Sequence, residues 1–193
     1  FYPASGKVYL DNLKNASIFY NVARIEEFPI SEPGEIFKNK KISIEAHPLE
    51  HSVESWGYRI KEHDNYTMLP EKLSALGIFG PNISELKNKR TFTIGEQVVS
   101  IEDVSVSKSG QIFAFIMDTR ECPSNNILAK NADLLVCEST YLSSEQQEAY
   151  NHGHMTAAQA ATVAKDAGVK RLVLTHFSQR YDALELFVEE AKK

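Results

Sequence analysis

Three apolar segments of the sequence each end at a side chain that can bind a metal or transfer a proton. "IFAFIM" is followed by Asp118, "DLLVC" by Glu138, and "RLVLT" by His176. In sheets of α/β proteins, ligand sites collect at the carboxyl ends of the strands. We therefore expect these three side chains to share one site.

Two further histidines stand at positions where they could join this site. His51 comes just before a predicted strand, and His154 comes just before a predicted helix N-terminus, which suits an anionic group. Histidine and aspartate are suitable ligands for zinc or a similar metal, and one aspartate can bridge two metals. Two metals would favour phosphodiester hydrolysis, and Glu138 with His154 would be available for proton transfer.

Each of these residues also has a purely structural interpretation. His176 could end its strand without binding metal, and Asp118 could form a turn with Thr119. Glu138 could cap the segment that follows it. Solvated surface positions are the interpretation for the remaining histidines, which are His47, His63 and His152. The spacing alone therefore leaves both interpretations open.

The strands that would position the site show two kinds of pattern. Residues 41–46 and 56–60 predict two strands, the first from its alternation of polar and apolar residues. The three segments that precede Asp118, Glu138 and His176 are continuously apolar, which is typical of strands buried on both faces. They form the core of the predicted sheet.

Helices alternate with these strands. Thr156 and Gln159 form a predicted capping box at the start of a helix that ends at Gly168. A last helix is predicted over about residues 182–193. The order strand, helix, strand, helix indicates an α/β sandwich.

The segment at about residues 62–110 differs from the rest. It begins with a short predicted helix at 70–77 and continues with turn residues and short alternating runs. We expect a protruding excursion with little core of its own. It carries a small basic cluster, which could bind phosphate or simply form a solvated face: Lys87, Lys89 and Arg90.

Composition limits the class of protein. A chain of 193 residues is long enough for one domain, and its net charge of −5 argues against broad non-specific nucleic-acid binding. No apolar run is long enough to span a bilayer, so no membrane association is expected. The two cysteines, Cys122 and Cys137, form no disulfide pattern and favour a reducing, cytoplasmic compartment.

Six segments taken together resemble a known family. "HSVESWGYR", "GPNISELKNK", "DTR", "ADLLVCESTY", "GHMTAAQAA" and "LTHFSQRY" occur in the order found in ribonuclease Z, the tRNA 3′-processing endonuclease. The resemblance covers roughly residues 40–190. It implies a metallo-β-lactamase αββα sandwich, with residues 1–193 forming part of that domain and a flexible arm inserted at about 62–110.

The resemblance also implies roles for individual residues. His51, Asp118 and His176 match metal ligands, with Asp118 the bridging one. Glu138 and His154 match a pair associated with proton delivery to the leaving 3′ oxygen. The cofactor expected is zinc, two ions per complete site, with manganese as the other possibility.

Substrate contacts are implied in two regions. Arg180, in "HFSQRY", is expected to meet phosphate. The arm is expected to grip the tRNA body by shape and backbone, with salt-dependent contacts. Its matching positions are Gly80, Pro81, Leu86, Lys87, Lys89 and Arg90.

One motif of the family, H-x-H-x-D-H, does not occur in this chain. We therefore expect that the first part of the protein is missing, that the fold is incomplete in its N-terminal part, and that this chain alone is metal-free and inactive. The complete protein is predicted to remove the 3′ trailer of precursor tRNA as a homodimer. Two alternatives are a hydrolase or phosphodiesterase of small substrates on the same fold, and a non-catalytic tRNA-binding module.

Overall fold

The computed structural model describes residues 1–18 and 22–193 of the chain. These residues divide into two compact units. The main unit comprises Phe1–Lys61 and Gln111–Lys193, and the inserted unit comprises Glu62–Gly110. Among the described residues, no helix is both long and apolar enough to cross a bilayer.

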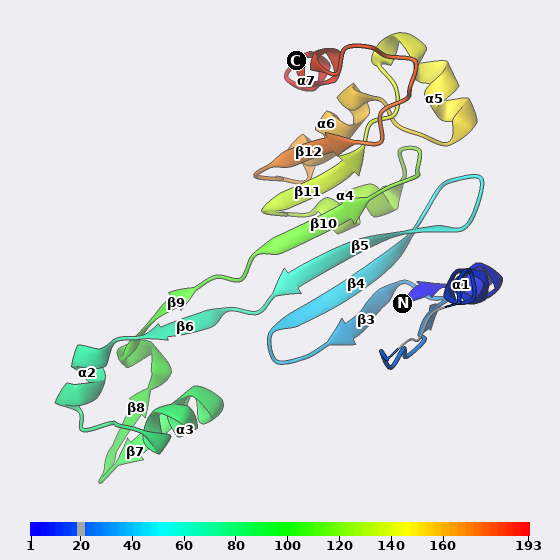
Figure 1. The fold of residues 1–193 in the computed structure, drawn as a ribbon. Coiled ribbons are helices and arrows are strands. Elements are labelled where there is room, and N and C mark those ends of the chain that lie inside the picture. Colours follow the sequence, from blue (N-terminus) through cyan, green and yellow to red (C-terminus); the bar gives the residue numbers. More distant parts are fainter. Residues whose placement is uncertain (19–21) are drawn as a thin grey trace. The chain divides into compact units, whose positions relative to one another are not determined.

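A six-stranded sheet forms the centre of the main unit, in the order β12-β11-β10-β5-β4-β3 (Figure 1). Its strands β10, β11 and β12 run parallel, whereas β5 is antiparallel to β10 and β3 to β4. All five predicted strands are confirmed. The bounds are β3 (Gly34–Lys38), β4 (Ile42–Leu49), β5 (Ser55–Glu62), β10 (Ile112–Ile116), β11 (Leu134–Glu138) and β12 (Leu172–Thr175).

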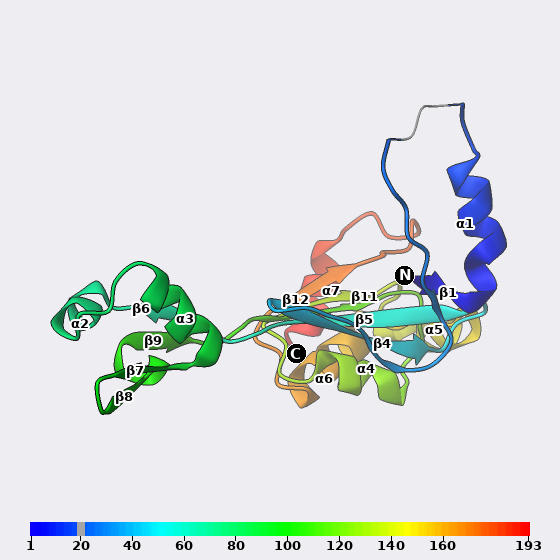
Figure 2. The same cartoon turned by 90° about the horizontal axis from the view of Figure 1, so that it is seen from below.

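One face of this sheet is covered by two helices, α4 (Pro123–Ala129) and α6 (Ala157–Asp166) (Figure 2). Ala114 of β10 and Leu135 of β11 are cross-strand partners on this face, and both are fully buried. They join the side chains of both helices in one apolar cluster. This core is what holds the carboxyl ends of the three parallel strands in place.

The opposite face of the sheet is less well covered. Val136 and Val173 are cross-strand partners there, and Val173 is 41% exposed. Phe113 and Phe115 on β10 are only partly buried. The expectation that all three strands are buried on both faces is therefore wrong for the described residues, because α4 and α6 pack against one face only.

The helix termini follow local sequence signals. The Thr156 hydroxyl accepts the Gln159 N–H at 3.2 Å, and the Gln159 side chain accepts the Thr156 N–H at 2.9 Å. The predicted capping box of α6 is thereby confirmed. The predicted last helix is also present, as α7 (Glu185–Ala191), and packs against α6. The other strands and α-helices described in this unit are β1 (Tyr2–Pro3), α1 (Lys7–Lys14), β2 (Pro29–Ile30) and α5 (Gln146–His152).

The inserted unit has a core of its own, which contradicts the expectation of little core. Two short antiparallel pairs, β6 with β9 and β7 with β8, accompany two helices. Six side chains are buried together: Leu73, Ile78, Leu86, Val99, Ile101 and Val104. The bounds are β6 (Asn65–Met68), α2 (Pro70–Ala75), α3 (Pro81–Lys89), β7 (Thr91–Ile94), β8 (Gln97–Ser100) and β9 (Ser105–Lys108).

Helix α3 was not predicted, although the sequence carries its signals. Pro81 occupies the first turn, where its missing N–H has no cost. Gly80 precedes it with φ 54° and ψ −124°, a conformation that side-chain-bearing residues avoid. Glu85 and Lys89 pair one turn apart at 2.7 Å. The residues "GPN" are also typical of turns, which is why the helix that begins at Pro81 was not predicted.

Candidate functional site

The carboxyl ends of β10, β11 and β12 bring the predicted site residues together. Asp118 Oδ1 lies 3.0 Å from His176 Nε2, and the backbone N–H of Thr119 donates to Glu138 Oε1 at 2.5 Å. Asp118 and His176 both adopt positive φ, at 52° and 61°. Residues other than glycine rarely adopt this conformation, which clusters at functional sites. The three strand ends therefore lie close together, as expected, and their forming one functional site stays a prediction.

Glu138 is a fully buried carboxylate with every oxygen engaged. Oε1 accepts the Thr119 N–H, and Oε2 accepts the Met155 N–H at 3.1 Å and the Thr140 hydroxyl at 2.7 Å. Burial by itself raises the pKa of Glu138, but the hydrogen bonds from His154, Thr119, Met155 and Thr140 outweigh it and lower the pKa. The site therefore holds Glu138 as an anion.

His154 is the nearest imidazole to this anion. Its Nδ1 lies 3.0 Å from Glu138 Oε1, and its side chain is only 14% exposed. The hydrogen bond to Glu138 raises the pKa of His154, and burial opposes this only in part. A carboxylate–imidazole pair of this kind can hold and release a proton near neutral pH.

His51 lies beside His154, with their ring centres 4.9 Å apart. Its Nδ1 is 3.0 Å from the Gly153 carbonyl, and a carbonyl can only accept, so Nδ1 carries the hydrogen. A side chain at Gly153 would come within 2.9 Å of this nitrogen, and Gly153 has φ 77°. Glycine at position 153 is thus required for the His51 ring to lie against the backbone there. Because Nδ1 carries the hydrogen, Nε2 is the ring nitrogen of His51 whose lone pair is available to a metal.

The donor atoms of this cluster fit a metal ion. One ligand atom each from Asp118, His154 and His176 can be chosen so that all three lie within 4.8 Å of one another. Imidazole nitrogen and carboxylate oxygen are the ligands that zinc and related metals use in proteins. The three residues whose ligand atoms lie close together thus include His154. His51 is not in this group, but its ring lies next to that of His154.

Arg180 is connected to this site by the ring of Tyr141, which lies between Arg180 and His154 in the chain of contacts. Its guanidinium lies 4.8 Å above the Tyr141 ring and pairs with Glu145 at 2.9 Å. The Tyr141 ring is in turn 6.2 Å from that of His154. This position is compatible with the predicted phosphate contact, although the Glu145 carboxylate already occupies part of the guanidinium.

The predicted binding positions of the inserted unit have diverse environments. Leu86 is fully buried in the core of the unit, so it supports helix α3 and cannot meet a ligand directly. Lys89 is paired with Glu85. Arg90 pairs with Glu102 at 2.6 Å and lies over the Tyr66 ring.

Lys87 differs from its neighbours, because it makes no ion pair within the described part of the chain. The inserted unit as a whole carries seven acidic and five basic side chains. The expected local positive charge is therefore restricted to a few side chains, and the unit is not basic overall.

Sequence reasoning missed two residues that hydrogen-bond within the site, Thr119 and Thr140, and the chain neighbour of Thr119, Arg120. Thr119 supplies the N–H that binds Glu138 and a hydroxyl that accepts the Glu50 N–H at 3.0 Å. Thr140 contacts both Glu138 and His176. Arg120 stacks over the Tyr150 ring at 4.6 Å. Their only sequence signal is their position within "DTR" and "EST", directly after the strand ends.

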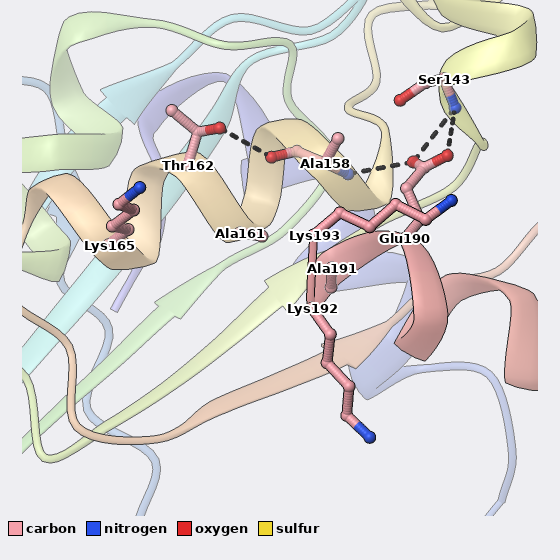
Figure 3. A pocket seen from close by; sticks show the side chains of 9 residues that line it. All are labelled: Ser143, Ala158, Ala161, Thr162, Lys165, Glu190, Ala191, Lys192 and Lys193. Atoms are coloured by element: carbon pink, nitrogen blue, oxygen red, sulfur yellow. Dashed lines mark hydrogen bonds between the residues drawn. The ribbon is translucent and has the colours of Figure 1, made fainter.

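A surface pocket lies apart from this cluster, between α6 and the end of α7 (Figure 3). Glu190 spans it and accepts the backbone N–H groups of Ser143 and Ala158, both at about 3 Å. A carboxylate at a helix N-terminus is favourable, so Glu190 caps α6 from the neighbouring helix. None of the predicted site residues lines this pocket.

Comparison with known proteins identifies relatives of this chain. Residues 101–177 match the family model described as a beta-lactamase superfamily domain. A protein named ribonuclease Z from Nocardia farcinica is 46% identical over 194 residues, and one from Chlamydia muridarum is 43% identical over 191. The chain resembles ribonuclease Z along its whole length. These alignments cover 100% and 99% of the chain but only 64% and 63% of the two relatives.

Solved structures give the same fold. The metallo-beta-lactamase fold protein YhfI from Bacillus subtilis matches with a TM-score of 0.51 over 83% of this chain and 44% of that chain. At 20% identity this likeness concerns the fold alone. The predicted resemblance to ribonuclease Z and the predicted metallo-β-lactamase fold class are both confirmed.

Proposed function

We propose that the protein carrying this chain is an endoribonuclease that removes the 3′ trailer of precursor tRNA by hydrolysing one phosphodiester bond and leaving a 3′-hydroxyl. The observation that carries the proposal is the convergence of Asp118, Glu138, His154 and His176 at one edge of the sheet, with His51 beside them. A module that only binds RNA has no need for this set. The choice of precursor tRNA as the substrate rests on the resemblance to ribonuclease Z.

The metal ligands in this proposal are His51, Asp118 and His176, as the resemblance implies. His154 also has a ligand atom close to those of Asp118 and His176, but we assign it to proton transfer because its Nδ1 is held by Glu138. Zinc, two ions per complete site, is the expected cofactor, with manganese as the alternative. Such ions would lower the pKa of a bound water and stabilise developing charge on the leaving oxygen. Asp118 Oδ1 and His176 Nε2 are 3.0 Å apart, a distance at which either a ring N–H or a bound cation must lie between the carboxylate and the imidazole.

Glu138 and His154 supply the proton for the leaving group in this proposal. The hydrogen bond between them holds the His154 ring by Nδ1 and leaves Nε2 free to face the substrate. Because Glu138 raises the pKa of His154, a larger fraction of His154 is protonated at neutral pH. The protonated ring can then donate to the 3′ oxygen as the phosphorus–oxygen bond breaks.

Arg180 and the inserted unit would bind the RNA. Arg180 approaches phosphate at the edge of the site, and Lys87 is the cation of the basic cluster in the inserted unit that is free to meet the tRNA backbone. We expect the complete protein to act as a homodimer in the cytoplasm.

The direct test replaces His176 by alanine in the complete protein. Loss of one metal ligand should lower precursor-tRNA cleavage by about 10³-fold or more, because metal stabilisation is worth several kcal/mol. The affinity for tRNA should stay within a few-fold. Cleavage at the wild-type rate would overturn the proposal.

A hydrolase of small phosphodiesters is the second candidate, and the charge of the inserted unit favours it. The unit has more acidic than basic side chains, and both Lys89 and Arg90 are already paired. Replacing residues 66–107 by a two-residue Asn-Gly turn tests this, because Asn65 and Lys108 are cross-strand partners.

The two candidates predict different results for this deletion. The ribonuclease proposal requires a much larger loss with precursor tRNA than with a chromogenic phosphodiester. Equal losses would favour small substrates. No hydrolysis of either substrate by the intact complete protein would leave only the tRNA-binding module.

A further inference from the structure

The Thr140 hydroxyl lies between the buried carboxylate and a proposed metal ligand. Its Oγ1 is 2.7 Å from Glu138 Oε2 and 2.8 Å from His176 Nδ1. Thr140 is 7% exposed, so water competes little for these contacts. One hydroxyl thus connects the acid–base pair of the site with its metal ligands.

The direction of these two hydrogen bonds follows from the number of hydrogens available. A hydroxyl has one hydrogen to give and lone pairs to accept with. Both oxygens of Glu138 already accept a backbone N–H, which marks them as acceptors, and Thr140 donates its hydrogen to Oε2. Oγ1 must then accept from His176, so Nδ1 of His176 carries a hydrogen.

The opposite arrangement is unfavourable. If Thr140 donated to His176 Nδ1, the lone pairs of Oγ1 and Glu138 Oε2 would face each other at 2.7 Å inside the protein. Oε2 would then keep only the Met155 N–H as its donor and would face a second acceptor, which is unfavourable in a buried site.

We propose that Thr140 is a positioning residue that accepts the Nδ1 hydrogen of His176, fixes the orientation of its ring, and so assigns Nε2 as the nitrogen that binds metal beside Asp118. The proposal rests on the metal-ligand role given to His176 above. His51 has the same tautomer, because its Nδ1–H donates to the Gly153 carbonyl.

Glu138 thereby orients two histidines of the site at once. It contacts His154 Nδ1 directly at 3.0 Å and His176 through the Thr140 hydroxyl. Outer hydrogen-bond partners of metal-binding histidines typically change metal affinity about 10–100-fold when they are removed. Thr140 should therefore matter for metal binding without touching the metal.

The test measures Zn²⁺ affinity of the complete protein by competition with a chromophoric chelator, for the wild type and three variants. Thr140→Val removes the acceptor with little change of shape and should weaken Zn²⁺ binding about 10–100-fold. Thr140→Ser keeps the hydroxyl and should restore near wild-type affinity. Ser139→Ala is the matched control, because the Ser139 hydroxyl donates to the Thr175 carbonyl and not to the His176 ring.

A spectroscopic measurement on the wild type keeps the proposal falsifiable even if Thr140→Val does not fold. In Zn²⁺-loaded protein with ¹⁵N-labelled histidine, the His176 ring should carry its hydrogen on Nδ1. A hydrogen on Nε2, or equal Zn²⁺ affinity for Thr140→Val and the wild type, would overturn the proposal. Neither readout uses RNA, so failure of the proposed substrate and failure of the Thr140 role are distinguishable.

Discussion

The main unit and the inserted unit are built on different principles. The main unit places a buried carboxylate, three histidines and an aspartate at the carboxyl edge of its sheet. The inserted unit gathers six buried apolar side chains from short elements and has no such cluster among its described residues. The candidate chemistry is therefore confined to the main unit, and a mutation can address either unit alone.

The two units also treat their charged residues differently. Glu138 is fully buried and accepts hydrogen bonds at both oxygens, whereas in the inserted unit Arg90 and Glu102 form an ion pair in which both side chains are more than half exposed. Exposed pairs contribute little to stability, while a buried carboxylate depends on every one of its partners. Substitutions of acidic residues should therefore be costly in one unit and tolerated in the other.

The largest effects on folding should come from the two cores. Leu135→Ala in the main unit and Leu86→Ala in the inserted unit both remove a fully buried side chain, at a cost of about 2–5 kcal/mol. Hydrogen exchange should show that each change loosens its own unit only. Equal loss of protection in both units from Leu86→Ala would show that they fold as one.

A smaller loss of stability is expected for Glu138→Gln. The amide keeps the shape of the carboxylate but turns an NH₂ group toward donors such as the Met155 N–H, which costs about 1–3 kcal/mol. Urea unfolding measures the change. Glu148→Gln, at an exposed carboxylate paired with His152, is the control and should stay within about 0.5 kcal/mol.

Glu138→Gln should also change the pH dependence of cleavage. Glu138 raises the pKa of His154, so cleavage by the complete protein should persist to higher pH and fall once the pH exceeds that raised pKa. Removing the negative charge should move this fall to lower pH. A pH–rate profile of Glu138→Gln that keeps its alkaline limb in place would contradict the assignment of His154 as the proton donor.

The smallest effect is expected in the basic cluster of the inserted unit. Lys87→Ala should weaken tRNA binding modestly and reduce the slope of affinity against salt by about 1, because one phosphate contact is lost. Lys89→Ala should do less, since Lys89 is already paired with Glu85. Filter binding at several salt concentrations compares the two variants. A larger effect of Lys89→Ala would contradict the assignment of Lys87 as the lysine that contacts phosphate.

Much of the fold could be predicted from local patterns. Capping by Thr156 and Gln159, the strand runs, and the rule that sites lie at strand carboxyl ends were sufficient to bring Asp118, Glu138 and His176 together. These features depend on neighbouring residues in the sequence and on the parallel pairing of three adjacent strands.

The remaining features depend on contacts between distant segments. The core of the inserted unit is assembled from short elements that each contribute one or two apolar side chains, so no single run of sequence predicts it. The role of Thr140 follows from the place of its hydroxyl between two residues 38 positions apart in the chain, Glu138 and His176. A threonine two positions after a glutamate carries no such signal.

The metal content of the complete protein and of two single variants tests the central claim most directly. The wild type should contain about two zinc ions per chain, and His176→Ala should lose at least one. His154→Ala should keep the wild-type content while cleaving slowly, because His154 is assigned to the proton and not to the metal. Unchanged metal in His176→Ala would contradict the assignment of this histidine as a ligand and return it to a structural role at the end of its strand.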